Sequence, residues 1–112
     1  MNGSFRILEY TEGEWSPFAE WFDKLDSVTA ARVDRYVRRL ESGNFGAAKA
    51  LRDGVCELRL DFGPGYRVYY GRDGSTVIVL LGGGDKRRQT ADIAAAVERW
   101  QRYKQTKEKP WH

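Results

Sequence analysis

The amino-acid sequence predicts an α+β fold, with a small antiparallel sheet, an N-terminal two-helix hairpin and a C-terminal helix. Two observations lead to this prediction. Between residues 54 and 84, three short runs alternate between apolar and polar residues or are wholly apolar, and glycine-containing turns separate them. On both sides of this region, apolar residues recur at helical spacing. At 112 residues and 41% hydrophobic composition, the chain is expected to form one domain over 1–112.

Three consecutive strands form the centre of this prediction. In the first, apolar residues alternate with charged ones, which gives one apolar and one charged face. The apolar set is Cys56, Leu58 and Leu60, and the charged set is Glu57, Arg59 and Asp61. The second strand, over 66–70, carries Arg67 and Tyr69 on one face, and the third, over 76–81, is apolar like a central strand. The sheet therefore presents arginines on one face, which suits a phosphate backbone.

The remaining segments are assigned from caps and periodicity. Ser16 and Pro17 begin a helix whose aromatic stripe we interpret as core rather than as a base-stacking surface. Asp26 or Ser27 begins a second helix that Gly43 ends. A short edge strand is expected at 5–9, a connecting loop at 44–53, a helix from residue 89 or 90, and a frayed polar tail at 104–112. The glycines at 82–84 are expected to bend the chain out of the sheet edge.

Charge is distributed unevenly along the chain. Up to Asp26, two basic residues face six acidic ones, which leaves −4 there and +7 in the remainder of a chain whose net charge is +3. A basic body with a pI near 9.1 suits an anionic partner, either nucleic acid or an acidic protein. One cysteine excludes an internal disulfide, and no metal site or cofactor is expected. Without a signal peptide or membrane span, a cytoplasmic location is expected.

Several blocks in this order resemble the RelE/ParE superfamily of toxins, and most of all its phage-derived branch of addiction-module killer or HigB-like proteins. The blocks are 54–59 (GVCELR), 63–70 (GPGYRVYY) and 80–86 (LLGGGDK), and the similarity runs from about Trp21 to Trp100. The resemblance implies the toxin of a type II toxin–antitoxin module, neutralised by an antitoxin of the helix-turn-helix DNA-binding type. The antitoxin is expected to cover basic residues with acidic ones.

Within that superfamily two activities occur, and the resemblance implies them in a definite order. RelE-like and HigB-like members cut mRNA on the ribosome, so a metal-independent endoribonuclease that inhibits translation is expected first. ParE-like members poison DNA gyrase without being enzymes, which is the alternative, and a degenerate member would retain only antitoxin binding.

Metal-free RNA cleavage needs a base for the 2′-hydroxyl, positive groups for the phosphorane and an acid for the leaving oxygen. Arg67 matches the phosphate-clamping arginine of the family, with Arg59 and Lys86 beside it. Glu57 stands where the nucleases often have a basic residue, and it is either a base or a partner in cross-strand ion pairs with Arg59 or Arg67 on an exposed face. Near Asp92 there is no tyrosine or histidine, so Tyr69 is the candidate substitute. The residues expected to hold RNA are Lys49, Arg52, Arg87 and Arg88.

Overall fold

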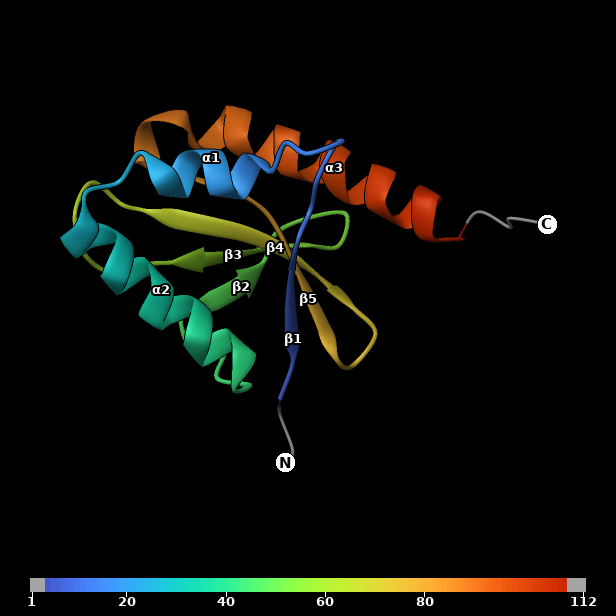
Figure 1. Ribbon diagram of the computed structural model, residues 1–112, viewed down its shortest axis with the longest axis horizontal. Coiled ribbons are helices and arrows are strands. Elements are labelled where there is room, and N and C mark those ends of the chain that lie inside the picture. Colours follow the sequence, from blue (N-terminus) through green and yellow to red (C-terminus); the bar gives the residue numbers. More distant parts are fainter. Residues whose placement is uncertain (1–3, 109–112) are drawn as a thin grey trace.

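The computed structural model describes residues 4–108, which form a five-stranded sheet with helices on both faces (Figure 1). The elements in chain order are β1 (Arg6–Glu9), α1 (Pro17–Asp23), α2 (Ser27–Glu41), β2 (Ala48–Ala50), β3 (Val55–Arg59), β4 (Arg67–Asp73), β5 (Val77–Gly84), the 3-10 turn η1 (Lys86–Arg88) and α3 (Gln89–Glu108). The predicted α+β class is confirmed.

The strands lie in the order β1-β5-β4-β3-β2, and every neighbouring pair is antiparallel except β1 with β5, which is parallel. The expected edge strand at the N-terminal end is therefore confirmed. The prediction of a plain loop over 44–53 was wrong, because β2 pairs there with β3. Its Ala-Lys-Ala sequence has no strand signature, and the segment is extended because its backbone completes the ladder of β3.

The caps that were read from the sequence form the helix ends. The Ser16 Oγ accepts from the Ala19 N–H at 3.0 Å, and the Asp26 Oδ1 accepts from the Thr29 N–H at 2.7 Å. Gly43 follows α2 with a φ of 89°, the left-handed conformation that ends a helix.

Helix α3 extends further than the sequence predicts. Residues 104–108 are helical rather than frayed, and residues 109–112 lie outside the described part of the chain. Two contacts with β4 hold this last stretch. The Tyr103 hydroxyl donates to Asp73 at 2.7 Å, and the Lys107 Nζ lies 2.9 Å from the same carboxylate. These contacts could not be predicted from residue spacing, because Asp73 lies 30 residues before Tyr103.

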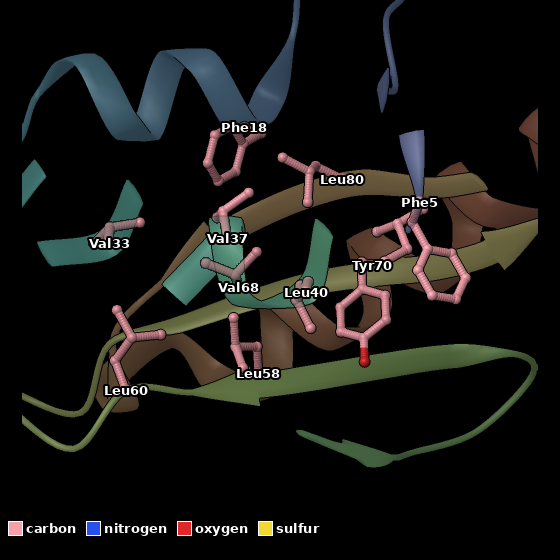
Figure 2. Packing of buried hydrophobic residues seen from close by; sticks show 11 residues of the cluster. Phe5, Phe18, Val33, Val37, Leu40, Leu58, Leu60, Val68, Tyr70 and Leu80 are labelled. Atoms are coloured by element: carbon pink, nitrogen blue, oxygen red, sulfur yellow. The ribbon is translucent and has the colours of Figure 1, made fainter. Parts of the chain in front are cut away.

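Two hydrophobic clusters occupy the two faces of the sheet. Figure 2 shows the first, in which Phe18 of α1 and Val37 and Leu40 of α2 pack on side chains of β3, β4 and β5. The second lies under α3 and is centred on Trp100, whose ring stacks on Tyr103. This arrangement follows the predicted alternation, because Leu58 belongs to the first cluster and its neighbour Glu57 faces α3. Both faces of the central strands are therefore covered.

The glycines at 82–84 stay within β5, so the predicted bend away from the sheet was wrong. They allow helices to approach the strand closely. A Cβ on Gly83 would collide with the Trp21 ring of α1, and a Cβ on Gly84 would collide with the Asp92 carboxylate of α3. The register between β4 and β5 also shifts next to these glycines, between Tyr69 and Tyr70 of β4. The glycines therefore bring α1 and α3 onto the same strand.

We predict that Gly83→Ala lowers the free energy of unfolding by about 1–3 kcal/mol, because the added methyl group must displace the Trp21 ring. Gly46→Ala is the matched control, since its Cβ would meet only the Asn44 side chain at 3.3 Å. The control should stay within about 0.5 kcal/mol of the wild type in urea unfolding. Equal stabilities for the two variants would contradict the close packing of α1 on β5.

Candidate functional site

The predicted site residues of β3 and β4 share the sheet face that is covered by η1 and α3. Cross-strand register places Lys49, Glu57 and Tyr69 in one row and Arg59 and Arg67 in the next. Both rows point to the same face because residues two apart in a strand do so. The sheet thus brings these five side chains together from three strands.

Glu57 and Arg67 form a buried ion pair rather than an exposed one. Their residues are 1% and 4% exposed, and the Arg67 Nε lies 2.8 Å from the Glu57 Oε2. The Arg67 Nε–H is not aligned with a hydrogen-bond acceptor, so this contact is chiefly ionic. The Arg67 Nη1 donates to the Gly65 carbonyl at 2.7 Å. The sequence predicted that this ion pair would lie on an exposed face. That part of the prediction was wrong, because the beginning of α3 covers the pair.

Gln89, the first residue of α3, covers this ion pair. Its Nε2 donates to the Glu57 Oε2 at 3.0 Å. The second carboxylate oxygen, Oε1, is buried without a hydrogen-bond partner in the described part of the chain and lies 4.0 Å from the Lys49 Nζ. Glu57 is thus held by Arg67 and Gln89 through one oxygen, and its other oxygen faces a lysine.

A ring of exposed basic side chains surrounds the pair. Lys49 and Arg59 border a hollow of about 210 Å³ that Glu57 also lines. Lys86 comes close on the other side, because its Cβ and the Arg67 Nη1 both lie next to Gly65. Arg87 and Arg88 are exposed in η1, and Arg87 lies 3.2 Å from Asp85. These cations give the mouth of the site a positive charge.

Arg52 does not join this group. It lies in the turn between β2 and β3, beside Asp53 at 3.3 Å. Gly54, two residues after Arg52, approaches the Trp100 ring at the opposite end of β3 from Arg59. The role of Arg52 in holding RNA remains a prediction, and Arg52 lies apart from the other cations.

Two further polar groups are buried under α3. Tyr69 is fully buried, its hydroxyl has no partner in residues 4–108, and burial raises its pKa. Burial also raises the pKa of Asp92, which packs on Gly84 and leaves its Oδ2 without a partner among the described residues. In this conformation the Tyr69 hydroxyl is out of reach of a ligand at the surface.

Gln89 and Asp92 also belong to the site, although they were not among the predicted site residues. They are three residues apart in the first turn of α3, which puts them on the same helix face, toward the sheet. That spacing was available in the sequence, but the strand residues that they meet were not. Within residues 4–108 there is no group of three or more His, Cys, Asp or Glu that could bind a metal ion.

Comparison with known proteins agrees with this architecture. The family model described as phage-derived protein Gp49-like (DUF891) matches residues 20–104. The chain belongs to this family. It is also 44% identical over 80 residues to an uncharacterized protein of Haemophilus influenzae, a match that covers 70% of this chain and 81% of the relative. The Gp49-like family is associated with toxin–antitoxin systems.

The Gp49-like match begins within α1, at residue 20, and includes every strand and turn that carries a predicted site residue and most of α3. In the described part of this Gp49-like chain, no helix is long and apolar enough to span a bilayer. Membership of a family associated with toxin–antitoxin systems suggests a protein partner for this chain, an antitoxin.

We predict that Arg67→Met in this Gp49-like protein lowers the free energy of unfolding by about 3–5 kcal/mol, because Glu57 would remain buried without its charge partner. Arg59→Met removes an exposed arginine from the neighbouring strand and should change stability by no more than about 0.5 kcal/mol. Combining Arg67→Met with Glu57→Leu should recover most of the loss. Equal effects of the two single substitutions in urea unfolding would exclude a tightly coupled buried pair.

We predict a pH dependence from Asp92, whose pKa is raised in the folded state. Below the unfolded-state pKa both states are protonated, so the shift has no effect; above it, the folded state resists ionisation and loses stability as pH rises. The stability of Asp92→Asn relative to wild type should therefore increase between about pH 4 and pH 7.

Asp61→Asn provides the opposite control. The Tyr36 hydroxyl donates to Asp61 at 2.5 Å and lowers the pKa of that carboxyl. The wild type therefore gains stability from Asp61 above the unfolded-state pKa and loses it as pH falls. The relative stability of Asp61→Asn should thus decrease as pH rises toward about 4 and stay level from about pH 4 to pH 7 in urea unfolding. Parallel curves for the two variants would refute the assignment.

Proposed function

We propose that this Gp49-like chain is the toxin of a type II toxin–antitoxin pair, and that it acts in the cytoplasm as a ribosome-dependent, metal-independent mRNA endonuclease of RelE/ParE type. The observation that carries the proposal is the ring of exposed cations, Lys49, Arg59 and Lys86, around the buried Glu57–Arg67 pair. Guanidinium and ammonium groups held together on a rigid sheet suit a phosphodiester whose charge increases in the transition state.

In the proposed reaction, the exposed and the buried residues of the site have different roles. Lys49, Arg59 and Lys86 contact the scissile phosphate and the developing charge on its oxygens, because their side chains reach solvent. Glu57 is the candidate base for the 2′-hydroxyl, since it lines the hollow and its Oε1 is free of the bonds that hold Oε2; because that oxygen is buried, proton transfer requires the side chains around the hollow to move when RNA binds. Arg67 acts mainly as a positioning residue, because its contacts with Glu57 and Gly65 fix the carboxylate.

One observation favours a second candidate, a gyrase poison that binds without catalysis. Tyr69 is fully buried, and residues 4–108 contain no histidine that could transfer a proton. A binding toxin requires no such group. In that case the same cations would form a docking surface for an acidic partner.

The partner in either case is an antitoxin, which we propose to be of the helix-turn-helix type. Its acidic side chains would cover the exposed cations of β2, β3 and η1. The chain would then be held inactive by occupation of the same surface that meets RNA.

The test is induction of the protein without an antitoxin, followed by mapping of new 5′ ends across all transcripts. We expect cuts inside translated codons, and about a 100-fold lower cleavage rate for Arg59→Ala, as for removal of one preorganised donor. Arg35→Ala is the matched control, because Arg35 is an equally exposed arginine on α2, away from the site.

The choice of Arg59 avoids an ambiguity, since loss of Arg67 also threatens the fold. Growth arrest with intact messages and double-strand DNA breaks would reject the nuclease and support the gyrase alternative. Unaffected growth would reject both activities.

A further inference from the structure

A second hollow, of about 280 Å³, lies between α1 and α3 over the end of β5. Trp15 and Trp21 line it from the side of α1, and Arg88, Asp92 and Arg99 line it from η1 and α3. The helices α1 and α3 pack on opposite faces of the sheet and approach each other near the end of β5, where α1 overlaps α3 in Figure 1. We call this hollow the tryptophan groove. Its floor includes Gly83, the strand residue on which Trp21 packs.

Trp15 stands at this groove with 41% of its surface exposed, and it is firmly held. Its backbone pairs with Glu12 through two hydrogen bonds of 2.9 and 3.1 Å. Its indole Nε1 donates to the Glu20 carboxylate, and the Arg99 guanidinium lies 5.4 Å from its ring centroid. An exposed aromatic ring that is fixed in this way presents a flat surface without a large further loss of side-chain entropy.

The groove also continues into the basic surface. Arg88 is exposed, forms no ion pair within residues 4–108, and follows Lys86 by two residues in η1. Lys86 faces the Arg67 side of η1, and Arg88 faces the tryptophan groove. A chain of phosphates that contacts Lys86 can therefore reach Arg88 by crossing one short turn. Asp92 adds a carboxylate acceptor to the wall of the groove.

We infer that the tryptophan groove binds one nucleobase of a single-stranded RNA, stacked on Trp15, with the adjoining phosphate on Arg88. The inference rests on the proposed function. Stacking on an exposed aromatic ring beside arginines is the usual way in which proteins hold unpaired bases. Asp92 accepts from an exocyclic amino group, which favours bases that carry one.

The test measures binding of a fluorescein-labelled, 2′-O-methyl 8-mer of mixed sequence by fluorescence anisotropy at low salt, because this probe cannot be cleaved. Trp15→Ala should weaken binding by about 5- to 160-fold, the range for loss of one base–aromatic stack. Trp15→Phe keeps a ring and should retain most of the affinity. Val28→Ala, at the 70% exposed valine of α2, should bind like the wild type.

Arg88→Ala separates phosphate contact from stacking. It should weaken binding and reduce the salt slope by about 1, whereas Trp15→Ala should leave the slope unchanged. Thermal melting of each variant checks that the fold is retained. Equal affinity of Trp15→Ala and wild type, or no binding of the probe by wild type, would overturn the inference.

A cellular arm separates this inference from the nuclease proposal. Trp15→Ala should still cut messages but with a relaxed base preference at the cut codon. If Arg59→Ala abolishes cutting while Trp15→Ala keeps the wild-type preference and affinity, the nuclease stands and the groove assignment fails. If the 8-mer binds through Trp15 but no message is cut in cells, the groove stands and the nuclease fails.

Discussion

The buried contact between Glu57 and Arg67 joins the strands of the site to the elements that cover them. Two opposite charges lie in the sheet with almost no access to water, at a separation of 2.8 Å. Removing both from water is unfavourable unless each finds further partners. Gln89 supplies one for Glu57, and the Gly65 carbonyl supplies one for Arg67. The beginning of α3 and the turn after β3 are therefore held against the sheet by the same two side chains.

This constraint explains how the basic surface is organised. With Arg67 committed to Glu57, the cations that remain free to meet a ligand are those at the rim, on β2, β3 and η1. They are carried by paired strands and by a short turn that Asp85 caps, so their backbone positions are rigid. A rigid ring of cations over a fixed carboxylate is an arrangement that can stabilise charge without reorganising during a reaction.

The glycines of β5 have a comparable influence at the end of the sheet. Because they carry no side chains, α1 and α3 both approach the strand, and residues from the two ends of the sequence meet there. Trp15 and Asp92 lie 77 positions apart in the chain and line one groove. The basic surface and the tryptophan groove are therefore joined through η1.

The local features of this protein could be predicted from its residues alone. Alternation in β3 assigned Leu58 and Glu57 to opposite faces, and the caps at Ser16 and Asp26 marked the helix starts. These signals are local because they depend on the pleat of a strand or on the first turn of a helix. Tertiary structure alone decided what covers each face. It buried Arg67 beneath α3, extended β2 along β3, anchored the end of α3 on Asp73 and brought Trp15 beside Asp92. No residue spacing encodes such contacts, since they arise between segments that come together only in the folded chain.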